Sequence, residues 1–313
     1  MLLNIVFSFR NEECNIPELV KRVNAAVSTI ADLSYEMIFV NDASTDQSLA
    51  LLLELRKTYP ITIVNMSRKF GVTPCVLAGL SFCKGDAVVY MDSDLQDPPE
   101  LIPELVKCYR DGADVVHTRR ISREGEGRIK MLLTRLAYRV INFFSDMSLP
   151  ENVGDFKLLS SRVVSQILSL GEYDPYMRGL SVWVGFKQAY VPYRREKRWG
   201  GEAKFPLLSK NPAREFVRGL TAFSAAPLWV AFVVGVICCL MALGLIIWAI
   251  GTKLLGIASP GASGVLIAVS FFSGMILISN GLIGLYVSRI YYQVKGRPRF
   301  IVESVVGAGD KSD

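Results

Sequence analysis

Short apolar runs alternate with longer amphipathic stretches over about the first 120 residues of the chain. The apolar runs predict strands at 3–9, 36–41, 61–66, 87–91 and 114–117. The amphipathic stretches predict helices at 15–30, 46–58, 73–83 and 99–110. This alternation is typical of an α/β fold with a Rossmann-like, mostly parallel sheet. Ligands bind such sheets beyond the carboxyl ends of the strands, where Asp42, Asp92 and Asp94 fall.

Two long stretches near the C-terminus, 225–250 and 259–288, contain no charged residue. The loop between them carries only Lys253. A membrane-spanning helix needs roughly 20 consecutive apolar residues, and both stretches meet that length. Buried core helices of a soluble protein are the alternative, but such helices seldom extend so far without a charge. The pattern therefore predicts a hairpin of two transmembrane helices, at about 225–250 and 264–288.

Two further segments, 127–147 and 205–223, combine an apolar stripe with basic residues. Each fits either a helix packed inside the protein or an amphipathic helix that lies in the membrane interface. We expect an α/β domain at 1–204, a juxtamembrane helix at 205–224, the membrane hairpin at 225–290 and a tail at 291–313.

The distribution of charge predicts an orientation for this hairpin. Basic residues lie just before the first span and just after the second: Lys204, Lys210, Arg214, Arg218, Arg289, Lys295, Arg297 and Arg299. The positive-inside rule then places both termini and the α/β domain in the cytoplasm, at the inner membrane. The N-terminus also lacks the pattern of a signal peptide. The net charge of +6 indicates anionic lipid headgroups as partners and no nucleic acid, because the sequence has no nucleic-acid-binding motif.

Asp92 and Asp94 stand two residues apart where a predicted strand gives way to a Pro-Pro turn. In extended chain, residues i and i+2 point the same way, so both carboxylates face one ion. Oxygen ligands in an open, hydrated site suit Mg²⁺ or Mn²⁺ better than zinc. Such an ion neutralises the charge of a departing nucleoside diphosphate. A plain acidic turn is the alternative, and the longer run DSDLQDPPE favours the metal site.

Two further polar residues and one charged run each allow a structural and a functional interpretation. Asp42 is either the N-cap of the next helix or a ligand contact, and the better-placed Ser44 and Asp46 favour the second. His117 ends a strand without Cys or His neighbours, so we expect it to be structural. The charged run 119–128 is either a solvated loop or a phosphate-binding segment, and its position after a strand favours phosphate.

Five motifs occur in order along residues 1–230. They are NEECNI at 11–16, VNDASTD at 40–46, DSDLQDPPE at 92–100, GDFKLLS at 154–160 and GGEAKF at 200–205. Their spacing resembles the family 2 glycosyltransferases of the GT-A fold, and within these the polyprenyl-phosphate glycosyltransferases. With the two C-terminal spans, the chain is most similar to the bactoprenol glucosyltransferases of O-antigen modification, which are related to dolichol-phosphate mannose synthases.

The resemblance implies a role for each motif residue. The nucleotide-sugar donor would be bound by Ser8, Arg10, Glu12, Asp42, Asp92, Ser93, Gln96, Arg120 and Lys130. The metal ion would be held by Asp92, Asp94 and Gln96. The catalytic group would comprise Asp94, Asp155, Arg198 and Lys204, with Asp155 on the acceptor side and the last two on a basic loop that closes over the diphosphate.

The chain also departs from the family pattern. Ser8 and Arg10 stand where a Pro-x-Tyr motif is usual, which puts the nucleoside contact in question. Ala203 and Phe205 replace a Ser and a Tyr beside Lys204. Arg195 occupies the glutamine position of the QxxRW motif of processive synthases, and two spans are too few for a polymer channel, so we expect a non-processive enzyme.

The resemblance predicts an inverting transferase that moves a hexose, glucose in the first instance, from a UDP-sugar to undecaprenyl phosphate. A phosphate monoester has a second pKa near 6, so it needs no strong base. A mannosyl or aminoarabinosyl donor, and a nucleotide-binding membrane adaptor without catalysis, remain alternatives. The sequence leaves open a homo-oligomer, for which small residues such as Gly281 and Gly284 offer close helix packing, and a separate flippase for the product.

Overall fold

The computed structural model describes residues 1–123, 153–196, 221–256 and 262–307, with the additional positions 139, 142–143, 150, 199–200 and 219. The predicted amphipathic helices at 127–147 and 205–223 therefore fall largely outside the described residues, as do Lys130, Arg198 and Lys204.

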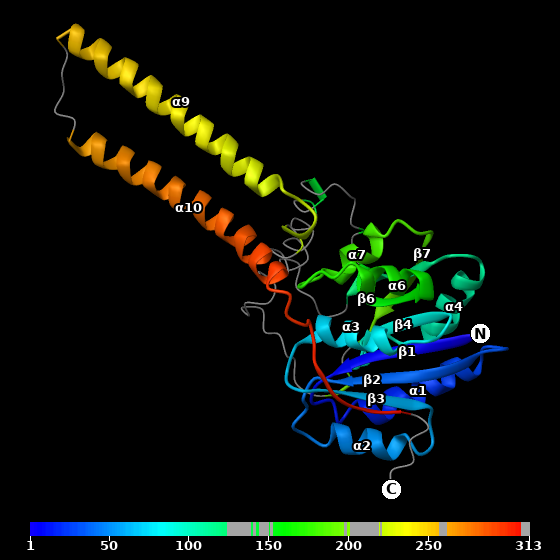
Figure 1. The fold of residues 1–313 in the computed structure, drawn as a ribbon. Coiled ribbons are helices and arrows are strands. Elements are labelled where there is room, and N and C mark those ends of the chain that lie inside the picture. The colour runs from blue at the N-terminus through cyan, green and yellow to red at the C-terminus, as the bar shows by residue number, and fades with distance from the viewer. Residues whose placement is uncertain are drawn as a thin grey trace.

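An eight-stranded sheet with strand order β7-β5-β6-β4-β1-β2-β3-β8 forms the centre of the α/β domain (Figure 1). In chain order the strands are β1 (Leu2–Phe9), β2 (Ser34–Asn41), β3 (Ile61–Met66), β4 (Ala87–Asp92), β5 (Val115–Arg123), β6 (Val153–Ser160), β7 (Gln188–Arg195) and β8 (Val302–Val306). Parallel pairs join β1 to β2, β1 to β4, β2 to β3 and β5 to β7, whereas β6 and β8 run antiparallel to their neighbours. The predicted mostly parallel α/β sheet is confirmed.

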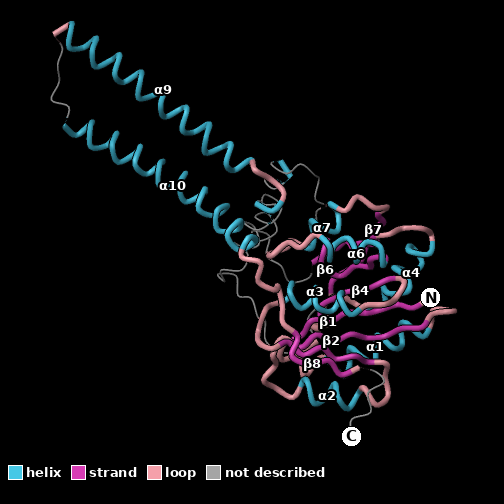
Figure 2. Tube along the Cα trace, viewed as in Figure 1, coloured by secondary structure: helices cyan, strands magenta, loops and turns pink. Residues whose placement is uncertain are grey.

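Helices cover both faces of this sheet (Figure 2). One face packs against α1 (Ile16–Ser28), α2 (Ser48–Leu55) and α4 (Ile102–Arg110), which follows the short 3₁₀ helix η1 (Pro99–Leu101). The other face packs against α3 (Val72–Phe82), α6 (Ser161–Ser169) and α7 (Met177–Trp183). Alternate residues of β1 enter the two cores, Leu3, Ile5 and Phe7 on the α1 side and Val6 on the α3 side, as the two-residue period of a strand requires.

The last strand, β8, returns the chain to the sheet after the apolar helices. It runs antiparallel to β3, with Val305 opposite Val64 and Ser304 opposite Asn65. Phe300 and Val302 pack against the core on the α3 side, and Arg56 donates a hydrogen bond from Nε to the Gly307 carbonyl over 2.9 Å. The sequence analysis did not predict this strand, which covers an otherwise unpaired edge of the sheet.

Helices α9 (Ala226–Leu254) and α10 (Ala262–Val294) form a hairpin that projects from the α/β domain (Figure 1). Ala226–Thr252 and Ala268–Val294 are each 27 residues long and apolar enough to cross a membrane, with mean hydropathies of 3.0 and 1.7. At the base of the hairpin, the Tyr286 hydroxyl donates to the Ser224 carbonyl over 2.8 Å. A Cβ atom at Gly281 or Gly284 would meet no described atom within 4 Å, so these glycines do not serve helix packing within the described part of this chain.

Candidate active site

The DSDLQD loop at the end of β4 presents alternate side chains to its two sides. Asp92, Asp94 and Gln96 are partly exposed, whereas the residue after each of them, Ser93, Leu95 and Asp97, is buried. The Asp94 carboxylate accepts a hydrogen bond from the Gln96 backbone N–H over 3.2 Å, which tightens the turn. The three residues predicted to bind the metal therefore share the open side of one loop. Ser93 instead donates from its buried hydroxyl to the Ser8 carbonyl over 3.2 Å.

The same loop contains a strained residue. Leu95 has a φ of +58° although it is not glycine, and its side chain is 1% exposed in the core on the α1 side. Asn11 after β1 and Ala43 after β2 have a φ of +53° each. A left-handed backbone at a residue other than glycine persists only where surrounding contacts enforce it, and it clusters at functional sites. These three residues all lie beyond the carboxyl ends of parallel strands, where ligands bind this type of sheet.

The loops after β1 and β2 are joined by polar side chains. Asn11 accepts the Thr45 backbone N–H over 2.8 Å, and Asp46 accepts the N–H and the hydroxyl of Ser48 at the start of α2. Asp46 thus acts at the start of this helix as expected. Glu12, which is 6% exposed, accepts from the Asn15 side chain over 2.5 Å. These contacts shape a polar rim beside the DSDLQD loop.

Asp42, predicted to contact the nucleotide, makes structural hydrogen bonds in this fold. Its carboxylate accepts the backbone N–H groups of Phe70 and Gly71 at 2.6 and 3.1 Å and is 6% exposed. Arg10, which stands at a departure from the family pattern, donates from Nη1 to the Asp42 carbonyl over 2.7 Å. Asp42 therefore ties the loop after β3 to the loop after β2.

Asp92 and Asp155 lie on the same face of two neighbouring strands. Tyr90 of β4 is the register partner of Lys157 of β6 in the antiparallel pair. Continuing this antiparallel register two residues forward along β4 and two back along β6 places Asp92 opposite Asp155, and the two carboxylates interact electrostatically. The predicted metal ligand and the predicted acceptor-side carboxylate are thus neighbours.

The paired carboxylates differ in their electrostatic surroundings. Burial, followed by the charges of Asp155, Asp94 and Asp97, raises the pKa of Asp92 from 3.8 to about 7. Burial would also raise the pKa of Asp155, but Arg178, Lys157 and Arg120 together lower it well below its usual value. Two neighbouring carboxylates whose pKa values are moved apart are typical of an active site.

A buried lysine lies beneath these carboxylates. Lys157 is 0% exposed, donates to the Ser181 hydroxyl over 2.9 Å and has its Nζ 5.7 Å from the centre of the Tyr90 ring. Burial lowers the pKa of Lys157 to about 7, with Asp155 opposing and Arg178 reinforcing that change. The sequence analysis did not assign Lys157 a role, although its position two residues after Asp155 on a strand indicates the shared face.

Arg178 of α7 is the direct partner of Asp155, and the sequence analysis missed it. Its Nε and Nη2 atoms donate to the two Asp155 oxygens over 3.0 and 2.5 Å. The two side chains are 35% and 31% exposed. No motif marks Arg178, because α7 lies more than 20 residues away in sequence and reaches β6 only through the tertiary fold.

Asp97 anchors a second cluster of cations. It is 1% exposed, accepts the hydroxyl proton of Tyr193 and lies 3.7 Å from Nη2 of Arg120 and from Nε of Arg195. Arg120 also donates to the Tyr193 oxygen over 2.9 Å. The predicted phosphate-binding residue Arg120 is thus held in place from beneath the DSDLQD loop. The sequence analysis did not assign Asp97 a role either.

Glu196 and Gly200, which flank the undescribed residues 197–198, each contact a loop of the site. The Glu196 N–H donates to the Gln96 carbonyl over 3.0 Å, and Asn15 donates from its side chain to the Gly200 carbonyl over 3.4 Å. The first bond involves the DSDLQD loop and the second the NEECNI motif. His117 lies elsewhere: it is buried, contacts Gln188 through Nε2 at 3.2 Å, and burial lowers its pKa to about 3.

The open side of the DSDLQD loop fits a divalent cation in charge and ligand type. Two carboxylates and an amide face the same side, and burial with like charge raises the pKa of Asp92, a cost that a cation relieves. Among the described residues no group of three or more His, Cys, Asp or Glu side chains is placed to enclose a metal.

The mostly parallel α/β sheet, with acidic residues beyond the carboxyl ends of its strands, is a GT-A-like fold. The glycosyl transferase family 2 model matches residues 4–168, and the chain belongs to this family. It is 39% identical to an uncharacterised glycosyltransferase of Synechocystis sp., with 97% of this chain and 96% of that protein covered. It is 35% identical to the bactoprenol glucosyl transferase of Shigella phage SfII, with 97% and 98% covered, and 34% identical to an Escherichia coli homologue over 97% and 99%.

Solved structures show a more distant likeness. The glucosyl-3-phosphoglycerate synthase of Mycobacterium tuberculosis in complex with phosphoglyceric acid is 21% identical, with a TM-score of 0.46. The matched region covers 71% of this chain and 79% of that protein.

Proposed function

We propose that this protein transfers glucose from UDP-glucose to undecaprenyl phosphate, with inversion at the anomeric carbon, at the cytoplasmic face of the membrane. The observation that carries the proposal is the pairing of Asp92 with Asp155 at the carboxyl edge of a sheet whose chain continues into an apolar hairpin. Full-length similarity to bactoprenol glucosyl transferases supports the lipid acceptor.

The donor is bound on the open side of the DSDLQD loop. Asp92, Asp94 and Gln96 would hold a divalent cation, which would supply the charge that neutralises the departing diphosphate. The nucleoside lies over Ser8, Glu12 and the rim of the loops after β1 and β2. Arg120 adds a fixed cation toward the phosphates, because Asp97 and Tyr193 hold its guanidinium.

The acceptor approaches from the side of Asp155. Its phosphate is an anion at neutral pH and attacks the anomeric carbon in line with the leaving diphosphate. Asp155 stays ionised because of Arg178, so it orients groups at the acceptor and is not the base that the reaction depends on. Arg198 and Lys204 of the basic loop, and Lys130, complete the set of residues proposed to contact phosphate oxygens. Membrane anchoring raises the local concentration of the lipid acceptor, so the enzyme needs less affinity for it.

A transfer assay tests the proposal. Purified protein in lipid micelles is given labelled UDP-glucose, UDP-galactose, UDP-N-acetylglucosamine or GDP-mannose, with undecaprenyl phosphate and Mn²⁺ or with EDTA. We expect label in the lipid from UDP-glucose alone, lost with EDTA and in Asp94→Ala. Transfer from another donor would correct the sugar. Binding of UDP without transfer from any donor would contradict the proposed reaction and favour an adaptor.

A further inference from the structure

Helix α7 connects the catalytic face to the base of the apolar hairpin. Phe223, just before α9, packs so closely on Gly179 that a Cβ atom at position 179 would collide with its ring. The same ring makes an edge contact with Tyr176, with the ring centres 6.3 Å apart. The first apolar helix therefore begins directly against α7.

The end of the second apolar helix, α10, is hydrogen-bonded to the loop that precedes α7 and stacks against it. Gln293 accepts the Tyr173 N–H over 2.8 Å and donates to the Gly171 carbonyl over 3.0 Å. The rings of Tyr292 and Tyr173 stack with their centres 5.3 Å apart. Residues 171–183, which we call the α7 segment, are thus bound by both ends of the hairpin base.

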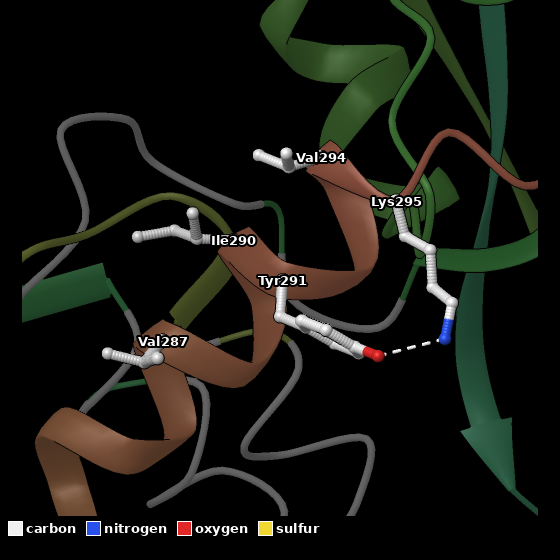
Figure 3. A pocket seen from close by; sticks show the side chains of 5 residues that line it. All are labelled: Val287, Ile290, Tyr291, Val294 and Lys295. Carbon is white, nitrogen blue, oxygen red and sulfur yellow. Dashed lines mark hydrogen bonds between the residues drawn. The ribbon is translucent and has the colours of Figure 1, made fainter.

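The C-terminal end of α10 carries apolar side chains followed by a tyrosine and a lysine (Figure 3). Val287, Ile290 and Val294 line a shallow apolar groove of about 340 Å³ with Tyr291 and Lys295 at its end. The Lys295 ammonium donates to the Tyr291 hydroxyl over 2.8 Å. Tyr and Lys after an apolar stretch are the usual residues at the boundary between hydrocarbon and headgroups. Gln293 lies on the same turns, so the α7 segment is bound beside the residues typical of that boundary.

From this position α7 presents Arg178 to Asp155. Three cations lower the pKa of Asp155, namely Arg178, Lys157 and Arg120. Lys157 is fully buried, and the Arg120 side chain is only 11% exposed and paired with Asp97. Arg178, at 35%, is the most accessible of the three. A guanidinium carries five N–H donors in a planar fork, so one group can serve a carboxylate and a phosphate together.

We propose that Arg178 binds the phosphate of the polyprenyl acceptor, and that the α7 segment places it where that phosphate emerges from the headgroup layer. This inference rests on the proposed function, because it names the residue that receives the lipid substrate. Arg178 offsets the repulsion between the phosphate dianion and the carboxylates of Asp92, Asp94 and Asp155. Asp155 in turn fixes the plane of the guanidinium through its two hydrogen bonds.

The test compares Arg178→Lys and Arg178→Gln with the wild type and with Arg162→Lys. Arg162 is a matched control, because it makes a two-point pair with Asp114 on the same domain but away from the site. Transfer is measured at varied undecaprenyl phosphate and at varied UDP-glucose. For Arg178→Lys we expect the KM for lipid to rise roughly tenfold or more, because two charge-assisted hydrogen bonds are lost or weakened, and the KM for donor to change less than about twofold. Arg162→Lys should match the wild type.

Two kinetic outcomes would overturn the inference. A rise in the KM for donor with an unchanged KM for lipid would assign Arg178 to the diphosphate. A loss of kcat alone, non-additive with Asp155→Asn, would make it a positioning residue for Asp155 only.

A binding measurement separates this inference from the proposed reaction. Undecaprenyl phosphate should raise the unfolding temperature of the wild type more than undecaprenol does, and Arg178→Gln should remove that difference. If the difference is present and depends on Arg178 while no sugar is transferred, the proposed reaction fails and the inference holds. If transfer occurs but the difference does not depend on Arg178, the inference fails and the reaction stands.

Discussion

A Cβ atom at Gly154 would stand 2.7 Å from Nη2 of Arg120. The glycine of the GDF motif therefore leaves room for the guanidinium that β5 directs toward the site. Arg120 occupies this space with its side chain 11% exposed and its Nη2 atom 3.7 Å from Asp97.

Gly154→Ala should displace Arg120 and weaken donor binding. The clash falls on the end of a flexible side chain, so we expect the domain to fold, with a loss of stability of about 1 kcal/mol. The affinity for UDP in the presence of Mn²⁺ should fall roughly tenfold, as one charge-assisted contact is lost. Titration calorimetry measures both this variant and Arg120→Lys, which should have a similar effect. An unchanged affinity in Gly154→Ala would limit the glycine to a packing role.

Asp97→Asn tests the cation cluster beneath the DSDLQD loop. Asparagine keeps an acceptor for the Tyr193 hydroxyl but removes the charge that faces Arg120 and Arg195. Removing the Asp97 charge leaves the charges of Arg120 and Arg195 uncompensated in a buried place. We therefore expect a loss of about 2 kcal/mol in unfolding free energy together with weaker donor binding. Denaturant unfolding measures the first effect. The control is Asp111→Asn, an exposed carboxylate after α4, which should change neither quantity.

The pattern along the chain was sufficient for the strands that precede the first three motifs, whereas β6, which carries GDFKLLS, was not predicted. The predicted strands at 3–9 and 61–66 match β1 and β3 to within one residue, because buried parallel strands read as continuous apolar runs. Asp92 and Asp94 are both partly exposed, but the residues after Asp92 form a turn with a left-handed Leu95, so the two-residue period of extended chain does not account for their shared side.

The residues beneath and beside the motifs could not be predicted in the same way. Arg178 and Asp97 act through contacts between elements distant in sequence, and no local pattern encodes which arginine will meet Asp155. The strand β8 has five residues and follows the apolar helix α10, so its pairing with β3 depends on where the hairpin returns the chain. Asp42 was predicted as a ligand contact, and its bonds to Phe70 and Gly71 show a structural role that sequence alone does not reveal.

Removal of β8 should destabilise the α/β domain. A chain that ends after Pro298 leaves the edge of β3 unpaired and uncovers the core surface that Phe300 and Val302 occupy. We expect a lower unfolding temperature and aggregation in detergent, measured by thermal scanning and size-exclusion chromatography. A chain that ends after Gly307 keeps β8 whole and should behave as the full-length protein. Equal stability of the two truncated chains would contradict a structural role for this strand.

The affinity for Mn²⁺ should depend on pH through Asp92. The pKa of Asp92 is raised to about 7 in the metal-free protein, so below that pH the cation must displace a proton. We expect the Kd for Mn²⁺ to fall by up to roughly tenfold per pH unit from pH 5 to 7 and to level off above it. Calorimetry in the presence of UDP measures this slope.

The stability of the metal-free protein should also depend on pH through Asp92. Whereas Mn²⁺ binding strengthens as pH rises, the stability of the metal-free fold should fall. Because the folded state binds the Asp92 proton more tightly than the unfolded chain does, the metal-free fold loses stability as pH rises from about 4 to 7. Mn²⁺ compensates for the charge, so the increase in unfolding temperature on adding Mn²⁺ should grow across that window. Lys157, whose pKa is lowered to about 7, titrates nearby, and Lys157→Met separates its contribution. Asp92→Asn has no carboxylate to titrate and should lose the pH dependence of the Mn²⁺ effect, whereas a dependence that persists in this variant would assign the proton to another group.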